Sequence, residues 1–236
     1  MFDNVEPLDR GRHGNLRLVP EQGYAFARGL TTVPLSYGEI SQASKFYPIV
    51  FSAGDRVVPY ALLSLKQGEN VFVGKEGEWL ATYVPAHIRR YPFILARSDE
   101  EGNYAVCVDS RAPHLSTDEG QPLYTEEGEP SDVLSRAMEF LKRYQQEMTD
   151  TERLFTSLQG RDLFSEKVLT VGRGEQQQAA IRGFRAVDTD RLAELEDSVL
   201  ADWVRRGVMG LVYAHLQSLD NVRELARKQN LESGSE

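Results

Sequence analysis

The sequence lacks the features that define several common classes of protein. Among its 236 residues Cys107 is the only cysteine, so an intrachain disulfide cannot form. A membrane-spanning helix needs roughly 18 to 20 apolar residues, and the longest apolar clusters, Val57–Leu65 and Val208–Leu216, are far shorter. The first ten residues show none of the basic, apolar and small-residue blocks of a secretory signal peptide. We therefore expect a soluble, cytoplasmic protein without a transmembrane segment.

Sequence motifs for metals, nucleotides and phosphates are missing as well. The four histidines occur in none of the usual metal-ligand spacings, and His-Glu-x-x-His is absent. Gly172-Arg-Gly174 is only a fragment of a dinucleotide fingerprint, and Gly74-Lys75 lacks the remainder of a P-loop. We therefore expect no metal ligand and no cofactor, and no residue is assigned as catalytic.

Positive charge is in deficit. With 36 acidic and 27 basic residues the net charge is −9, so the overall field repels phosphate backbones and anionic lipid headgroups. We expect no nucleic-acid partner. The apolar and charged fractions, 41% and 27%, are those of an ordinary globular protein, and a chain of this length suits one main core. The composition thus predicts a single folded domain over residues 1–236.

Glycines and prolines divide the first half of the chain. Residues 1–35 are typical of an N-terminal arm with one or two strands. Ser36-Tyr-Gly-Glu39 then matches a capping box and predicts a helix of about three turns that ends before Pro48. Residues 36–112 are rich in short β-type runs. These are Ile49–Ser52, Val57–Leu65, Asn70–Val73, Trp79–Tyr83, Phe93–Arg97 and Tyr104–Asp109, of which the last two predict an antiparallel hairpin.

The second half, residues 131–230, has helical periodicity. Ser131 is suited to cap a helix whose apolar residues repeat every three or four positions. Thr149-Asp-Thr-Glu152 matches a second capping box and predicts a new helix that Gly160 closes. Together with the sheet of about residues 49–109, this half predicts the fold class α+β, with a central mixed or antiparallel sheet covered by the C-terminal helices.

Shorter signals follow in the C-terminal part. Gly183–Val187 predicts a further strand, and Asp188 is suited to cap a short helix. Gly207 and Gly210 interrupt the last apolar stripe, where glycine costs about 1 kcal/mol relative to alanine in a helix. We expect a break or kink at each glycine, and a final helix capped by Ser218.

Four ordered segments carry a family resemblance. They are Tyr47–Phe51, Glu69–Val73 with Trp79, Tyr83–Phe93, and Gly207–Leu219. Together they resemble the bacterial SapC family over most of the sequence, which implies one SapC-like domain. The family takes its name from a protein tied to a paracrystalline surface layer. Its members often lie in gene neighbourhoods with outer-membrane receptors and halogenase-like proteins, which implies a non-catalytic accessory or binding protein; a structural role at the cell surface is an alternative.

The segment between Pro85 and Pro92 is the most distinctive local feature. The two prolines bracket a single helical turn that carries Arg89 and Arg90. A guanidinium is a rigid fork for a carboxylate or phosphate. Because adjacent residues on a helical turn diverge by about 100°, we expect one arginine to face a site and the other to brace it or meet solvent. The alternative is a structural role, in which one arginine pairs with a carboxylate at the edge of the core and the other is solvated.

Aromatic residues surround this turn and complete the candidate site. The predicted ligand-binding residues are Arg89, Arg90, Trp79, Tyr83 and Tyr91. Their chemistry indicates a partner that is a protein, a peptide or a small anionic ligand, such as a carboxylated molecule. The sequence leaves the oligomeric state open, a homo-oligomer included.

An enzyme is the competing hypothesis. Cys107, Asp109 and His114 are close in sequence, and a thiolate nucleophile needs a nearby base and an orienting carboxylate; His87 is a further candidate base. Against this, a lone cysteine in the run Tyr-Ala-Val-Cys-Val is usually a small core residue. His215 lies in an apolar helical stripe, where we expect a satisfied, partly buried imidazole.

Overall fold

The computed structural model describes residues 1–19, 22–54, 56–97, 103–171 and 178–229. It contains helices and three antiparallel sheets, so the α+β class is confirmed. The largest sheet has the strand order β10-β11-β4-β5-β3. Its strands are β3 (Thr32–Pro34), β4 (Ile49–Ser52), β5 (Pro59–Leu62), β10 (Phe164–Val171) and β11 (Gln178–Val187).

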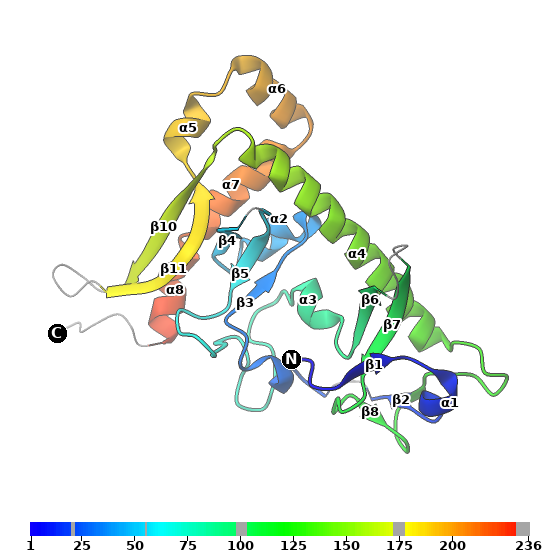
Figure 1. The fold of residues 1–236 in the computed structure, drawn as a ribbon. Coiled ribbons are helices and arrows are strands. Elements are labelled where there is room, and N and C mark those ends of the chain that lie inside the picture. Colours follow the sequence, from blue (N-terminus) through cyan, green and yellow to red (C-terminus); the bar gives the residue numbers. More distant parts are fainter. Residues whose placement is uncertain (20–21, 55, 98–102, 172–177, 230–236) are drawn as a thin grey trace, which may run out of the picture.

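Two smaller sheets lie toward the other end of the molecule (Figure 1). One has the order β1-β7-β6, with β1 (Val5–Pro7), β6 (Phe93–Arg97) and β7 (Tyr104–Asp109). The other has the order β8-β2-β9, with β2 (Arg17–Leu18), β8 (Leu115–Ser116) and β9 (Gln121–Pro122).

The helices are mostly short. The helical elements are α1 (Arg10–His13), α2 (Ile40–Ala43), α3 (Ala86–Arg89), α4 (Asp132–Gln159), α5 (Thr189–Ala193), α6 (Asp197–Arg205), α7 (Val208–Ser218) and α8 (Asn221–Lys228), with 3-10 turns η1 (Ala25–Ala27) and η2 (Tyr37–Glu39). Ser36 and Glu39 form the predicted capping box, but the helix ends at Ala43 and is shorter than three turns.

The strands of the central segment are divided between two sheets. The predicted hairpin of β6 and β7 is confirmed, with Phe93 opposite Val108. The strands β4 and β5 belong instead to the five-stranded sheet, where β4 pairs with the distant β11. The predicted strands at Asn70–Val73 and Trp79–Tyr83 are wrong, since only an isolated bridge joins Val73 to Trp79. The side chain of Asn70 accepts the Phe72 N–H, and this local bond turns the backbone away from a ladder.

Helix α4 is one continuous helix of 28 residues. Ser131 caps it as predicted, because its side chain accepts the N–H of Leu134. The predicted new start at Thr149-Asp-Thr-Glu152 is wrong. The hydroxyls of Thr149 and Thr151 donate to carbonyls one turn earlier, those of Gln145 and Glu147, and so they sit within the helix without capping it.

The length of α4 lets it serve two hydrophobic cores. Leu134 and Leu141 pack in a small core with Phe93 of β6. Phe155 and Leu158 pack in the main core beneath the five-stranded sheet. In Figure 1 the helix runs along one side of the molecule, from the neighbourhood of α7 to the β6–β7 hairpin. The continuous helix buries apolar residues at both ends, which offsets the local capping preference in its middle.

The C-terminal elements confirm some predictions and correct others. Asp188 caps α5 through the N–H groups of its first turn, and β11 extends the predicted strand. Gly207 separates α6 from α7 with φ of 76°, a left-handed conformation that suits glycine. The helix does not break at Gly210, because that residue lies inside α7. Ser218 is the last residue of α7 and does not cap α8.

Helix α7 completes the hydrogen bonding of the sheet it covers. His215 is fully buried, and its imidazole bonds to the Val187 N–H and the Ile49 carbonyl. Ser218 accepts the N–H of Ile49. The expectation of a satisfied imidazole is confirmed, although the burial is complete and not partial. Across the described ranges, none of the helices combines the length and apolar character needed to cross a bilayer.

Candidate functional site

The carboxylate of Glu39 accepts hydrogen bonds from its own turn and from the segment that leads into α3. It is buried, and its Oε2 accepts the N–H of Ser36 at 3.0 Å. Its Oε1 accepts the Tyr83 hydroxyl at 2.7 Å and the Ala86 N–H at 2.6 Å. Burial, followed by the hydrogen bond to Glu39, raises the pKa of Tyr83, so its hydroxyl stays protonated and donates. These charge-assisted bonds hold η2 against the start of α3.

A pocket of about 250 Å³ lies where η2 and α3 meet α4. Its lining comprises Gly38, Glu39, Tyr83, Ala86, Arg89, Phe140, Arg143, Tyr144 and Glu147. The four residues from α4 follow the spacing i, i+3, i+4 and i+7, which places them on one face of the helix. The volume is smaller than the roughly 300–1,000 Å³ typical of sites for drug-sized ligands, so the pocket suits a small molecule.

Two guanidinium groups stand at this pocket without a carboxylate partner. Arg89 is exposed, its Nε donates to the Val84 carbonyl at 3.0 Å, and its guanidinium lies 5.2 Å from the centre of the Phe140 ring. The guanidinium of Arg143 lies 6.0 Å from the same ring. Within the described ranges, neither arginine is within 4.0 Å of a carboxylate oxygen.

A chain of hydrogen bonds orients the hydroxyl of Tyr144. Nη2 of Arg90 lies 3.3 Å from Nε2 of His87, and because a guanidinium only donates, Nε2 accepts. The ring proton of the neutral imidazole is therefore on Nδ1, which lies 3.0 Å from the Tyr144 hydroxyl and donates to it. Burial and the charge of Arg90 lower the pKa of His87 to about 3, so the ring is neutral near pH 7.

The proton of the Tyr144 hydroxyl is left for another acceptor. Burial raises the pKa of Tyr144, so the group stays protonated. Its bond with His87 is its one hydrogen bond among the residues that the structure describes. Since Tyr144 lines the pocket, its O–H is a third donor beside the two arginines.

The sequence model of the SapC family matches residues 8–225, a range that includes every residue of the pocket. The chain belongs to the SapC family. No curated protein and no solved structure matches it.

In this SapC-family chain, two of the five predicted ligand-binding residues line the pocket. Tyr83 and Arg89 do so, whereas Arg90 is not part of the lining and its guanidinium lies 5.4 Å from the centre of the Tyr144 ring. The Nε1 of Trp79 donates to the Tyr47 hydroxyl at 2.9 Å, and its ring packs in the main core.

Tyr91 also lies away from the pocket. Its ring stacks on Phe26 at 4.0 Å, and its hydroxyl donates to Asp109 at 3.4 Å. Sequence reasoning missed the contribution of α4, although the spacing of Phe140, Arg143 and Glu147 marks one helical face.

Arg90 has the bracing position. Its guanidinium lies 5.4 Å from the centres of the Phe2 and Tyr144 rings, a cation between two aromatic faces. Its Nε is buried and has no hydrogen-bond partner in the described part of the chain. Burial lowers the pKa of Arg90. The two adjacent arginines of this SapC-family protein therefore have different surroundings, as their angular separation on the helical turn requires.

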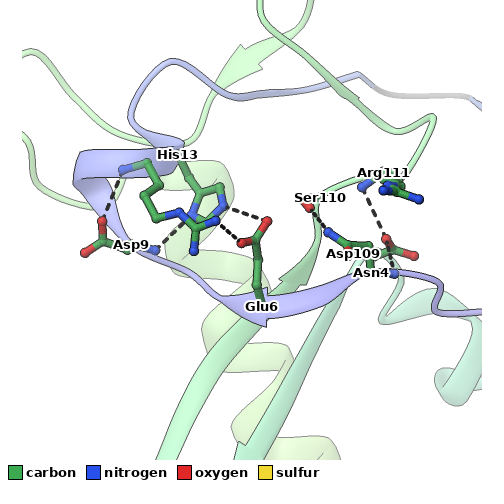
Figure 2. A network of polar contacts seen from close by, with 8 residues as sticks. Asn4, Glu6, Asp9, His13, Asp109, Ser110 and Arg111 are labelled. Atoms are coloured by element: carbon green, nitrogen blue, oxygen red, sulfur yellow. Dashed lines mark hydrogen bonds and ion pairs between the residues drawn. The ribbon is translucent and has the colours of Figure 1, made fainter.

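The residues of the competing enzyme hypothesis each contact other parts of the chain and not one another. The carboxylate of Asp109 accepts the N–H groups of Asp3 at 2.9 Å and of Asn4 at 3.1 Å, and it holds the N-terminal arm against β7. Figure 2 shows Asn4 and Arg111 next to Asp109 and, beside them, a second network in which His13 contacts Glu6. Arg12 forms an ion pair with the same Glu6.

The other two members of that trio have partners of their own. Cys107 is buried, its Sγ lies 3.9 Å from the Ala105 carbonyl, and burial raises the pKa of the thiol. His114 donates through Nε2 to the Gly23 carbonyl at 3.1 Å. Among the described residues no hydrogen bond joins Cys107, Asp109 and His114 to one another. No group of three or more His, Cys, Asp and Glu residues in those ranges is arranged to hold a metal ion.

Proposed function

We propose that this SapC-family chain is a non-catalytic binding protein that takes the carboxylate of a small molecule in the pocket between η2, α3 and α4. The observation that carries the proposal is the pair of guanidinium groups, Arg89 and Arg143, which line the pocket and have no carboxylate partner among the described residues. In a protein of net charge −9, these two guanidinium groups are the cationic donors of the pocket to which a ligand carboxylate can bind.

The donors suit a carboxylate in number and kind. A carboxylate has about four acceptor positions and is often bound by forked guanidinium groups. The pocket presents the free N–H groups of the two arginines together with the O–H of Tyr144. The aromatic rings of Tyr83 and Phe140 provide an apolar wall for the rest of the ligand.

The same groups support binding more than catalysis. Glu39 already accepts three hydrogen bonds, so it is poorly placed to act as a general base. The raised pKa of Tyr83 and of Tyr144 keeps both hydroxyls protonated near pH 7. The pocket thus holds committed donors and acceptors, and an accessory protein that carries or presents a small acid fits this chemistry.

The test uses small carboxylates as probes. Benzoate, hexanoate and 3-phenylpropionate are titrated against the full chain and binding is followed by ligand-observed NMR. Removing one charge-assisted contact should cost about 1.5–3 kcal/mol, so Arg89→Ala and Arg143→Ala should each weaken binding by about tenfold or more. The melting temperature should hardly change, because both side chains are exposed.

A matched variant distinguishes the loss of a ligand contact from the loss of one positive charge on the protein. Lys142→Ala removes a positive charge from the same turn of α4 at an exposed position outside the pocket, and it should leave probe binding unchanged. The opposite pattern, a clear drop in melting temperature for Arg89→Ala and Arg143→Ala with no change in binding, would show that the arginines are structural.

We further propose a cytoplasmic location. The support is the single cysteine, which is buried and cannot form an intrachain disulfide. Fractionation of the native cell should place the protein in the cytoplasmic fraction, and recovery mainly at the cell surface would contradict this.

A further inference from the structure

The pocket also contains a carboxylate that is not paired with the arginines. Glu147 follows Arg143 by four residues on α4, a spacing at which oppositely charged side chains usually meet. Here no oxygen of Glu147 lies within 4.0 Å of a guanidinium nitrogen in the described ranges. The reason is on η2: the hydroxyl of Ser36 donates to Oε2 of Glu147 at 2.8 Å and draws the carboxylate toward that turn.

This arrangement leaves one acceptor oxygen free in the pocket. The Oε1 of Glu147 has no hydrogen bond among the residues that the structure describes. Glu39, the other carboxylate of the lining, is buried and already accepts from Ser36, Tyr83 and Ala86. A cationic group of a ligand would therefore meet Glu147.

The charges of the lining are balanced. Two guanidinium groups and two carboxylates sum to zero. Among the described residues Arg89 and Arg143 have no ion-pair partner, and only one oxygen of Glu147 has a hydrogen bond. A ligand with a carboxylate alone can bind the two arginines, but it adds one negative charge to the balanced lining and leaves Glu147 without a cationic partner. A ligand that carries both a carboxylate and an ammonium adds no net charge and gives each unpaired group a partner.

We infer that the ligand is a small zwitterionic amino acid, whose carboxylate is bound by Arg89 and Arg143 and whose ammonium is bound by Glu147. The inference rests on the proposed function and specifies its ligand class. The carboxylate also accepts the O–H of Tyr144, whose orientation His87 and Arg90 set. The pocket of about 250 Å³ matches a free amino acid better than a longer peptide.

The experiment compares ligands that differ by one charged group. The twenty standard L-amino acids are titrated individually against the full chain. Each one that binds is compared with its deamino acid and its decarboxylated amine; for phenylalanine these are 3-phenylpropionate and 2-phenylethylamine. We expect the amino acid to bind about tenfold more tightly than its deamino counterpart, because one charge-assisted contact is lost.

The variant Glu147→Gln keeps the size of the side chain and removes its charge. It should abolish the tenfold preference for the amino acid over the deamino acid and leave the affinity of the deamino acid nearly unchanged. Glu139→Gln, at an exposed position of α4 outside the pocket, is the matched control and should keep the preference. Arg89→Ala should weaken both ligands by a similar factor.

The outcomes distinguish this inference from the proposed function. If no amino acid binds more tightly than its deamino counterpart, or if Glu147→Gln keeps the preference, the inference of a zwitterionic ligand is wrong. In either case, simple carboxylates that bind in an Arg89-dependent way would leave the proposed function standing. If no carboxylate probe depends on Arg89, the proposed function itself fails.

Discussion

The Nε2 of His215 accepts the backbone N–H of Val187 at 3.1 Å, inside the main core. Nδ1 of the same ring lies 2.9 Å from the carbonyl of Ile49, so one imidazole of α7 links β11 to β4. The two strands pair directly only at Phe184 with Ser52 and Arg185 with Phe51. The side chain therefore serves as a hydrogen-bonded bridge where the ladder stops.

Replacing this bridge should destabilise the protein. His215→Ala leaves a buried N–H and a buried carbonyl without partners, and each such group costs about 1–3 kcal/mol. We expect the free energy of unfolding to fall by about 3 kcal/mol or more, measured by urea denaturation. Tyr213→Ala, at an exposed position of the same helix, should change it by about 0.5 kcal/mol or less. Equal losses in the two variants would contradict the bridging role.

His215, which is buried, and His87, which is half-buried, predict a pH dependence of stability. Burial lowers the pKa of His87 to about 3 and that of His215 to about 4, whereas an unfolded histidine titrates near 6.5. As the pH falls from about 6.5 to 4, the unfolded state binds protons that the folded state does not. The stability that comes from keeping both rings neutral is fully present above pH 6.5. Below that pH, each histidine lowers the free energy of unfolding by about 1.4 kcal/mol per pH unit.

One variant shows how much of this pH dependence comes from His87. Urea unfolding of the wild type and of His87→Gln is measured at pH 7, 6 and 5. The variant should lose less stability between pH 6 and 5, by about 1 kcal/mol, because one titrating group has been removed. The same slope in both proteins would show that His87 does not titrate as the buried ring requires.

Replacing Arg90 should destabilise the protein more than replacing Arg89. Arg90→Ala removes a cation from between two aromatic rings and leaves Nε2 of His87 without its donor. We expect a loss of about 2 kcal/mol in the free energy of unfolding. Arg89→Ala, at the exposed pocket position, should stay within about 0.5 kcal/mol. A larger loss for Arg89 than for Arg90 would reverse the two roles.

Cys107 should behave as a core residue. Its side chain is 4% exposed, and burial raises the pKa of the thiol, so little reactive thiolate is present near neutral pH. Iodoacetamide should label the native protein slowly and the urea-unfolded protein rapidly. Cys107→Ala should cost about 1 kcal/mol and leave probe binding intact. Rapid labelling of the native thiol would instead identify an activated cysteine.

Asp109 should control the N-terminal arm. Asp109→Asn replaces one acceptor oxygen by an N–H₂ group that faces the backbone donors of Asp3 and Asn4. Hydrogen exchange at these two amides should accelerate in the variant, while the amides of α4 stay protected. Asp118→Asn, at an exposed loop position, is the control. Unchanged exchange at Asp3 and Asn4 would show that other contacts hold the arm.

Features that depend on neighbours in sequence could be predicted from the sequence. Ser131 and Asp188 cap their helices because the side chain and the N–H groups it accepts are two or three residues apart. The β6–β7 hairpin follows from two β-type runs separated by a short polar stretch of sequence. The different surroundings of Arg89 and Arg90 follow from the angle between adjacent residues on a helical turn.

Features that depend on distant segments were decided by the tertiary structure. No local pattern pairs β4 with β11, or places the carboxylate of Asp109 on the N–H of Asp3, 106 residues away. The capping signal at Thr149-Asp-Thr-Glu152 loses to a continuous α4, because the unbroken helix buries apolar residues in both cores.

The candidate pocket depends on local sequence and on tertiary packing. The sequence by itself determined that Glu39 caps η2 and that α3 presents Arg89 on a short turn, since both depend on backbone geometry within a few residues. Only the packing of α4 decided that Arg143, Tyr144 and Glu147 stand opposite them. A helix can expose any of its faces to solvent, and the side that becomes a pocket wall is selected by which apolar side chains its neighbours bury.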